Sequence, residues 1–325
     1  MSMNTKALHS KTLVHHTEGY IDYIKTVKAR SLNTINAYAQ DLKCFSNFLA
    51  AANACFSELC EQSVTSYLKY LRQVRQLKPA TVRRRLLTLQ GFCNWLAVGG
   101  FMKANPFDDL VLDLKVPKRL PRPVDPLTIR QLLLENRQLL NAPGLEKHDG
   151  ESSSRTLQKQ TTLVIIQLMI TTGVRVGEVT AIRINDISSD GKTIHIIGKG
   201  EKERLVYIEN TQLADALSQY ANERNSSGEA LDSLFVNGRG KALTPQTIRK
   251  RVKSLCVDLG TSDTPTPHRF RHSAATLLIE NGADIRVVQR LLGHASISTT
   301  ELYTQVSDVS LKDALRKADV LRQFQ

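Results

Sequence analysis

The stretch HRFRHSAATLLIENGADIRVVQRLLGHASISTTELYTQV (268–306) decides the fold class of this 325-residue chain. Its apolar residues recur at helical spacing, which predicts helices over 269–280, 284–291 and 296–303. Gly293 follows the second of these helices, at a normal position for a helix C-cap. The stretch therefore predicts a helical C-terminal region, which continues into a further amphipathic helix at 308–322.

Upstream of that stretch the pattern changes to a short sheet. The segment IRINDISSDGKTIHIIGKGEKERLVYI (182–208) alternates apolar and polar residues around turn clusters at Ser188–Lys192 and Gly198–Lys202, which predicts antiparallel strands. The polar, serine-containing segment 141–160 is predicted to be a surface loop. The C-terminal domain, 127–306, is therefore predicted to be mainly α with a small antiparallel β-sheet. Its other predicted helices cover 161–172, 211–222 and 244–259.

The N-terminal part is predicted to be a small all-helical bundle. This predicted domain covers residues 14–113. Helical spacing runs from Val14 to Ala97, with Ser31 and Ser63 as expected N-caps and Pro79 in the first turn of a helix. The segment LKVPKRLPRPVDP (114–126) has four prolines and four basic residues, which is typical of an extended linker. Residues 1–13 are predicted to be an N-terminal extension and 307–325 a C-terminal helix.

Composition favours a nucleic-acid partner. The net charge is +13, and residues 1–124 hold 18 basic and 8 acidic side chains, against 26 and 23 in the rest. A basic first half fits a nucleic-acid clamp, although a merely solvated basic surface is the alternative. No apolar run of about 18 residues and no secretory signal are present, so we expect a cytoplasmic protein without membrane spans. The five cysteines lack metal-site spacing, so no metal is expected.

Six side chains in the C-terminal half fit one reaction, the attack of a tyrosine hydroxyl on a DNA phosphodiester. The phosphodiester gains negative charge in its transition state, which fixed Arg, Lys and His donors stabilise. The tyrosine forms a covalent intermediate, and a lysine or histidine protonates the departing hydroxyl. Taken singly, each of these residues is compatible with an ordinary structural or surface role. The six are Arg175, Lys199, His268, Arg271, His294 and Tyr303.

The order and spacing of these motifs closely resemble those of the tyrosine recombinases, the phage-integrase and Xer-like site-specific recombinases. The likeness covers TTGVRVGEVTAIRINDI, IIGKGEKERLVYI and 268–306, and extends to the N-terminal SLNTINAYAQDLKCFSNFL. The resemblance implies a SAM-like helical core-binding domain and a catalytic domain that form a C-shaped clamp on DNA. It also implies roles for the candidate residues: Tyr303 as nucleophile, Arg175, Arg271 and His294 as phosphate ligands, Lys199 as general acid, His268 in proton transfer, and Glu178 supporting the active-site arginine and histidine.

The reaction implied by the resemblance needs neither a cofactor nor a metal. The tyrosine becomes joined to DNA as a 3′-phosphotyrosine and releases a 5′-hydroxyl, and a hydroxyl from a partner strand reverses the step. The implied substrate is a pair of double-stranded recombination sites. A homotetramer of the recombinase would hold the two sites together, and the free protein would be a monomer. Accessory or partner recombinases are also implied. The C-terminal helix would dock on a neighbouring protomer; packing on its own domain is the alternative.

Contacts with DNA outside the catalytic set are predicted from two basic helices. The segment LTPQTIRKRVKSL (243–255) has Thr244 as its expected N-cap, and the equivalent helix of the family lies in a DNA groove. Without the resemblance, a solvated basic helix is an equal alternative. The predicted DNA-contact residues are Arg249, Lys250 and Arg251 in this helix and Lys78, Arg83, Arg84 and Arg85 in the first domain.

The sequence leaves two alternative functions open. A type IB topoisomerase shares the chemistry but relaxes DNA without exchanging partners, and the Xer-like N-terminal domain and amphipathic tail argue against it. A non-catalytic DNA-binding regulator is the second alternative. The sequence does not give the DNA target or the order of strand exchange. Nor does it distinguish integration and excision of a mobile element from resolution of replicon multimers.

Overall fold

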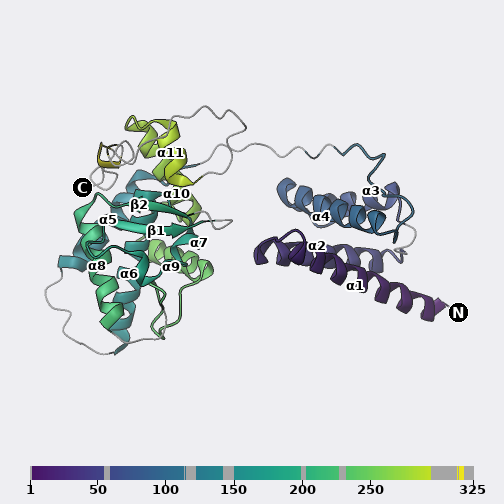
Figure 1. Ribbon diagram of the computed structural model, residues 1–325, viewed down its shortest axis with the longest axis horizontal. Helices are drawn as coiled ribbons and strands as arrows, with labels where there is room; N and C mark the ends of the chain where they lie inside the picture. The colour runs from purple at the N-terminus through teal and green to yellow at the C-terminus, as the bar shows by residue number, and fades with distance from the viewer. Residues whose placement is uncertain are drawn as a thin grey trace. The chain divides into compact units, whose positions relative to one another are not determined.

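The computed structural model describes residues 2–54, 59–112, 114, 122–141, 150–198, 203–226, 232–293, 313 and 315–317. The chain divides into two compact units, Met1–Arg119 and Leu120–Gln325, whose elements are labelled in Figure 1. The division falls within the predicted linker. Among the described helices, none is both long enough and apolar enough to cross a bilayer.

The N-terminal unit is an all-helical bundle, as predicted. Its helices are α1 (Ser2–Thr26), α2 (Leu32–Ala51), α3 (Glu61–Lys69), which continues into a π-helical turn (Tyr70–Val74), and α4 (Pro79–Val98). Helices α1, α2 and α4 pack on one another. Between them lie buried aromatic and aliphatic side chains that recur at helical spacing, including Tyr20, Phe45, Tyr67, Leu89 and Phe92.

Helix capping in this unit follows two of the three predictions. The Ser31 hydroxyl accepts a hydrogen bond from the Thr34 amide, which makes it the N-cap of α2, and Pro79 opens α4. Ser63 is not an N-cap: α3 is capped by Cys60, whose amide donates to the Ser63 hydroxyl at 3.4 Å. The Ser63 hydroxyl, three residues into the helix, thus accepts from the amide of the N-cap residue, as the third residue of a capping box does.

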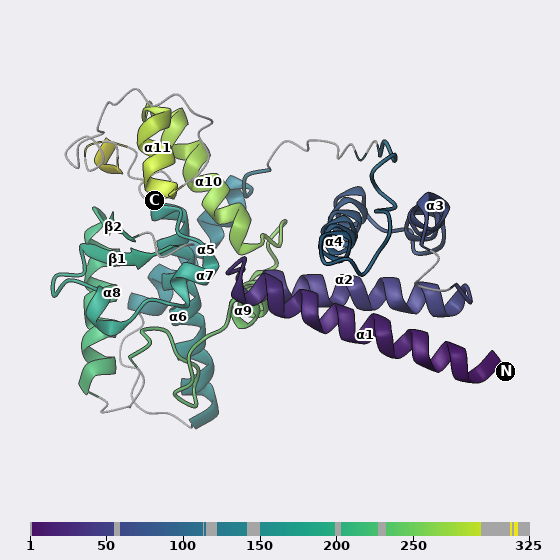
Figure 2. The same ribbon diagram turned by 45° about the vertical axis from the view of Figure 1, so that its right-hand side comes forward.

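The C-terminal unit is organised around one buried helix, α6. Every side chain of α6 from Thr161 to Thr172 is buried, and helices α5, α8, α9 and α10 pack against it. Figure 2 shows α10 and α11 lying side by side in this unit, as in Figure 1. The unit consists of α5 (Pro126–Asn141), α6 (Gly150–Thr172), α7 (Val176–Val179), a 3-10 turn (Ile184–Asp186), β1 (Thr193–Ile197), β2 (Glu203–Tyr207), α8 (Thr211–Ser226), α9 (Pro245–Asp258), α10 (Pro267–Glu280) and α11 (Ile285–Leu292).

The predicted small antiparallel sheet is confirmed. Strands β1 and β2 pair in antiparallel register, with Ile194 opposite Val206 on the buried face. Gly191 shapes the turn before β1 with φ +68°, and a Cβ at this position would overlap the Ala214 carbonyl oxygen. Glycine is therefore needed for both the backbone conformation and the close approach.

The predicted loop at 141–160 is wrong over residues 150–160, where α6 begins at Gly150. Serine and threonine cost a helix only a fraction of a kcal/mol each, so a polar composition indicates a solvated surface rather than a loop. The hydroxyls of Thr161 and Thr162 donate to carbonyls one turn earlier, those of Leu157 and Gln158. Residues 142–149 lie outside the described part.

The predicted C-terminal helix is described only at Asp313 and at 315–317, which are helical. Leu315 is buried in the core of the C-terminal unit, and Arg316 lies 3.8 Å from Glu209. These contacts follow the alternative in which the tail packs on its own domain. The helix predicted at 296–303 lies outside the described residues.

Candidate active site

Arg175 and Glu178 form a tight pair at the break between α6 and α7. Arg175 is the N-cap of α7, and Glu178 occupies the third position of that helix. The Arg175 amide donates to Glu178 Oε2 at 2.8 Å, and Arg175 Nη1 donates to Glu178 Oε1 at 2.7 Å. One carboxylate therefore fixes both the backbone and the side chain of this arginine.

Arg204 of β2 grips the same carboxylate from the other side. Its Nη1 and Nη2 donate to Glu178 Oε1 and Oε2 at 3.1 and 2.8 Å, a bidentate pair. Burial alone would raise the pKa of Glu178, but the hydrogen bonds from Arg204 and Arg175 outweigh it, so the pKa is lowered. Glu178 is therefore charged at neutral pH and is shared by two guanidinium groups.

Arg271 of α10 lies deeper in the unit. Its two Nη atoms donate to the carbonyl oxygens of Gly173 and Leu292. Burial, followed by the charges of Arg175 and Arg204, lowers its pKa to about 10, with Glu178 opposing the shift. Arg271 consequently stays protonated at neutral pH, inside a part of the protein where charge is costly.

The three arginines meet at the C-terminal end of α11, where they bind three consecutive carbonyl oxygens. Arg204 Nε donates to Leu291 at 3.2 Å, Arg271 Nη2 to Leu292, and Arg175 Nη2 to Gly293 at 3.2 Å. The last carbonyls of a helix lack partners within it and form the negative end of its dipole, so cations stabilise them. Gly293 has the left-handed conformation, φ 60°, which confirms the predicted C-cap. The backbone that enters residue 294 is thereby anchored.

The cluster formed by Arg175, Arg204, Arg271 and Glu178, here called the arginine cluster, has three positive charges and one negative charge. Arg175 is its most exposed guanidinium, with 39% of the side chain accessible, whereas Arg204 has 15%. Two of the five side-chain N–H donors of Arg175 bind described residues. An excess of preorganised positive charge at a solvent-facing guanidinium suits a phosphodiester, whose charge grows in a transition state.

The structure describes four of the seven predicted site residues. It brings Arg175, Glu178 and Arg271 together around the α11 terminus, as set out above. His268 is exposed in the first turn of α10, three residues before Arg271. The neighbouring His272 is half-buried, and burial, together with the nearby His268, lowers its pKa. The other three predicted residues, Lys199, His294 and Tyr303, lie outside the described residues.

Arg204 is the functional candidate that the sequence analysis missed. The signal was present in the strand pattern: in ERLVY (203–207) the exposed Glu203 and Leu205 alternate with Arg204 and the buried Val206. A charged residue on the inward face of a strand needs a buried partner of opposite charge. That requirement, applied to Arg204, would have pointed to Glu178.

Gly173 controls how closely α11 approaches α6. It has φ +67°, and a Cβ at this position would overlap the side chain of Leu292. We expect Gly173→Ala to lower the free energy of unfolding by about 1–2 kcal/mol from the left-handed backbone alone. Thermal denaturation measures this loss. Gly177→Ala is the control, because a Cβ at Gly177 meets nothing within 4 Å; equal losses in both variants would contradict the expectation.

The predicted DNA-contact residues of α4 divide into two groups. Lys78 and Arg83 are exposed. Arg84 and Arg85 both pair with the buried Asp41, and Arg85 Nη1 also donates to the Cys44 sulfur at 2.8 Å. The Arg85 side chain is only 12% accessible, so its positive charge serves the contact between α2 and α4.

The basic helix α9 divides in a similar way. Thr244 caps it and Pro245 opens it, as predicted, and Arg249 and Lys250 are exposed. Arg251 is half-buried, and burial lowers its pKa. Arg249 and Lys250 are therefore better presented to a phosphate than Arg251.

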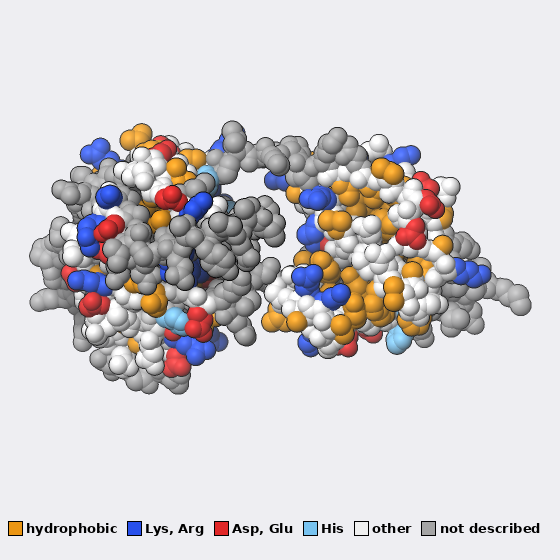
Figure 3. Space-filling model, turned by 45° about the horizontal axis from the view of Figure 1, so that its top comes forward, with side chains coloured by type: hydrophobic (Ala, Val, Ile, Leu, Met, Phe, Trp, Pro, Cys, Tyr) orange, Lys and Arg blue, Asp and Glu red, His pale blue; other side chains and the backbone are white. Residues whose placement is uncertain are grey.

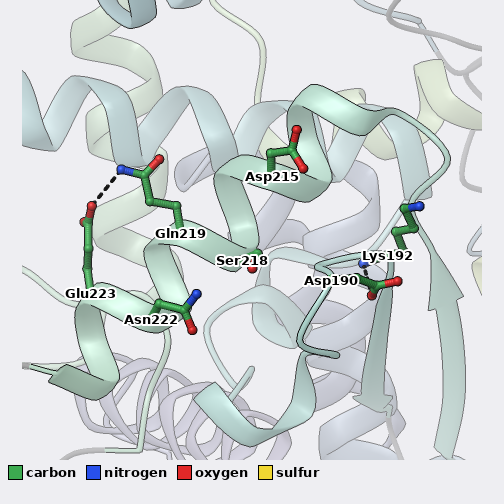
Figure 4. A pocket seen from close by; sticks show the side chains of 7 residues that line it. All are labelled: Asp190, Lys192, Asp215, Ser218, Gln219, Asn222 and Glu223. Atoms are coloured by element: carbon green, nitrogen blue, oxygen red, sulfur yellow. Dashed lines mark hydrogen bonds between the residues drawn. The ribbon is translucent and has the colours of Figure 1, made fainter.

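Surface views place other features outside the arginine cluster. Figure 3 shows apolar side chains widely exposed on one face of the N-terminal unit, with lysine and arginine side chains at several points around them. The C-terminal unit also has an open hollow of about 860 Å³, and Figure 4 shows side chains that line it, among them those of Asp190, Asp215, Glu223 and Lys192. None of its described lining residues belongs to the arginine cluster. An acidic hollow repels phosphate, so this is not the DNA site.

Sequence comparison finds two family models that match the chain. The model of the phage integrase family matches residues 145–309, and that of the phage integrase N-terminal SAM-like domain matches residues 17–99. The tyrosine recombinase XerC of Leptospira interrogans is 32% identical, with 95% of this chain and 94% of that protein covered. The tyrosine recombinase XerD of Staphylococcus haemolyticus is also 32% identical, with 91% and 95% covered.

Two solved structures that share the fold are recombinase–DNA complexes. The XerH site-specific recombinase in its post-cleavage complex with a palindromic difH substrate has a TM-score of 0.65 at 21% identity, covering 99% of this chain and 87% of that one. The Tn1549 transposon integrase with transposon right end DNA has a TM-score of 0.63 at 17% identity, covering 93% and 98%. At these identities the likeness concerns the fold.

Proposed function

The chain belongs to the phage integrase family of tyrosine recombinases, which cleave and rejoin DNA, and on this premise we propose that the arginine cluster binds the scissile phosphate of a recombination site. The resemblance drawn from the sequence motifs is thus confirmed. The observation that carries the proposal is the convergence of Arg175 and Arg271 on adjacent carbonyls, from helices far apart in the sequence. Arg175, which is bonded to Glu178, and Arg271, which donates to the neighbouring carbonyl, would together supply the positive charge of an anion site.

In the proposed reaction the Tyr303 oxygen attacks phosphorus, and the bond from phosphorus to the 5′-oxygen breaks. The leaving oxygen takes a proton from Lys199, the predicted general acid, and becomes the free 5′-hydroxyl. The phenolic proton of Tyr303 passes to the imidazole of His268 as the new bond forms. Arg175, Arg271 and His294 bind the non-bridging oxygens, where negative charge develops. The 3′-phosphotyrosine keeps the bond energy, so a 5′-hydroxyl from the partner strand reseals it without ATP.

Assembly, location and biological role are also proposals. The XerH site-specific recombinase is solved in complexes with difH substrate, and we propose that this chain likewise binds double-stranded recombination sites. Two sites would be synapsed by four protomers. Docking of the C-terminal helix on a neighbouring protomer would require Leu315 to leave the core of its own unit, in which it is buried. The reaction takes place in the cytoplasm, where the substrate DNA lies. Partner or accessory recombinases would act in the same synapse.

The test begins with the DNA site. The full chain is incubated with sheared DNA from its own locus, and fragments that become covalently joined to protein are recovered and sequenced. Paired duplexes carrying the recovered site are then scored for exchanged products. Exchange between two duplexes supports the proposal. Relaxation of supercoiled DNA without exchange would favour a topoisomerase, and binding without any covalent product would favour a regulator; either result would contradict recombination.

We further propose that Lys78 and Arg83, rather than Arg85, contact phosphates from α4. The expected result for Arg83→Ala is weaker DNA binding, with the slope of log affinity against log salt reduced by about 1. Its free energy of unfolding should change by less than about 0.5 kcal/mol. Arg85→Ala should instead lose about 1–3 kcal/mol of stability, because Asp41 loses a partner. DNA affinity as a function of salt concentration and chemical denaturation are measured for both variants. A stability loss in Arg83→Ala together with a binding loss confined to Arg85→Ala would overturn the assignment.

A further inference from the structure

We propose that Arg204 is a positioning residue for DNA cleavage, which acts through Glu178 on Arg175. This inference rests on the proposed function. Arg204 is on β2, whereas Arg175 and Glu178 are at the start of α7, so the contact joins the sheet to the helical part of the unit. Arg204 belongs to the arginine cluster, but in the proposed reaction the phosphate oxygens are bound by Arg175, Arg271 and His294 and not by Arg204.

The Glu178 carboxylate is shared between Arg175 and Arg204. Oε1 accepts from Nη1 of Arg175 and from Nη1 of Arg204, while Oε2 accepts from the Arg175 amide and from Nη2 of Arg204. A carboxylate held by a planar bidentate fork cannot rotate without breaking two bonds. Arg204 therefore fixes the plane of Glu178, and Glu178 in turn fixes the direction of the Arg175 guanidinium.

Arg204 also binds the end of α11, because its Nε donates to the Leu291 carbonyl oxygen at 3.2 Å. Through this bond one side chain links β2, the carboxylate of α7 and the end of α11, where Arg175 binds the Gly293 carbonyl. Loss of Arg204 would therefore leave both partners of Arg175, the Glu178 carboxylate and the Gly293 carbonyl, less firmly held. A shift of about 1 Å in a group that binds the transition state costs about 100-fold in rate.

Arg204 adds a third positive charge beside Arg175 and Arg271. Glu178 is the one acidic member of the arginine cluster, and Arg175 and Arg204 both lower the pKa of Arg271. A third arginine with a merely structural role would be an unfavourable choice beside two phosphate ligands, because it adds like charge. Its bidentate pairing with Glu178 offsets that cost, and the same pairing fixes the orientation of the carboxylate that Arg175 shares.

The test compares cleavage by Arg204→Ala, Arg204→Lys and the wild type at saturating protein on a nicked duplex that carries the recovered site. Arg204→Ala should form the covalent adduct about 10- to 100-fold more slowly, with DNA affinity changed less than about 3-fold. Arg204→Lys should lie between, because one ammonium cannot replace a planar fork. The matched control is Glu203→Gln, the next residue on β2, whose exposed carboxylate pairs with His195 at 3.1 Å; it should cleave normally.

A double-mutant cycle identifies the route. If Arg204 acts through Glu178, Arg204→Ala should add less than about 3-fold to the defect of Glu178→Gln, because coupled residues are not additive. Additive defects would overturn the proposed route. The thermal stability of every variant is measured alongside its cleavage rate. If Arg204→Ala folds poorly, the cleavage rate of Arg204→Lys and the double-mutant cycle still test the proposal.

A modified substrate tests the other route, in which Arg204 acts on the predicted general acid Lys199. Replacing the 5′-bridging oxygen by sulfur creates a thiolate leaving group that needs no proton, since thiol pKa values lie near 8.5. The defect of Arg204→Ala should persist on this substrate. Rescue by sulfur would contradict action through Arg175. Absence of any wild-type adduct would count against the proposed function, whereas normal cleavage by Arg204→Ala would count against this inference alone.

Discussion

Replacement of Tyr303 by phenylalanine is expected to abolish the covalent protein–DNA adduct, with a loss of more than about 10⁴-fold in cleavage rate. The phenol oxygen is the atom proposed to join phosphorus, and no arrangement of the arginine cluster can replace a missing nucleophile. Binding should be nearly unchanged, because Tyr303→Phe removes one oxygen and leaves every phosphate ligand in place. The measurement is adduct formation on a nicked duplex, resolved by denaturing electrophoresis.

The control for this variant is Tyr220→Phe, a half-buried tyrosine on α8 that packs against Phe235. It should cleave at the wild-type rate. An adduct formed by Tyr303→Phe at a comparable rate would disprove the assignment of the nucleophile without touching the family assignment. Loss of binding together with cleavage would instead show that Tyr303 has a structural role.

Much of the fold was predictable because its signals are local. Helical spacing gave the bundle in the N-terminal unit, and the caps at Ser31, Thr244 and Gly293 followed from the chemistry of helix ends. The two failures also have local causes. Ser63 satisfies an amide from inside its helix rather than from the cap, and the start of α6 is polar but still helical. Composition reports solvation, whereas helix formation depends on small propensity differences and on packing.

The candidate site was predictable as a set of residues but not as a geometry. Arg175, Glu178 and Arg271 were chosen from ordered motifs, and the structure does bring them together. Arg175, Arg271 and Arg204 donate to three consecutive carbonyl oxygens at the C-terminal end of α11, and this convergence depends on tertiary packing, which motif spacing does not contain. Arg204 was missed for the same reason: its partner lies on another element, and the motif that includes it drew attention to Lys199 instead.

Replacement of Arg271 by lysine should reduce cleavage by about 10²- to 10³-fold at saturating protein, the usual cost of losing one donor to a developing anion. The substitution keeps a positive charge near the site but removes the planar fork that spans the Gly173 and Leu292 carbonyls. The matched control is Arg269→Lys on the same helix. Arg269 also donates to two backbone carbonyls and pairs with Asp263, but it has no proposed role in cleavage. Its substitution therefore shows the effect of losing comparable structural contacts alone. We expect this control to affect stability and to leave cleavage unchanged.

The pH dependence of the Arg271→Lys variant separates loss of charge from loss of geometry. The buried site lowers the Arg271 pKa to about 10, and an ordinary lysine begins near 10.4, about two units below arginine. A lysine in the same surroundings must therefore titrate well below its ordinary value, since burial and the neighbouring arginines act in the same direction. Its positive charge is present at low pH and is lost as pH rises, so residual cleavage should fall at alkaline pH where the wild type is still active. A parallel pH profile in both proteins would argue that the Arg271 charge does not act on the phosphate.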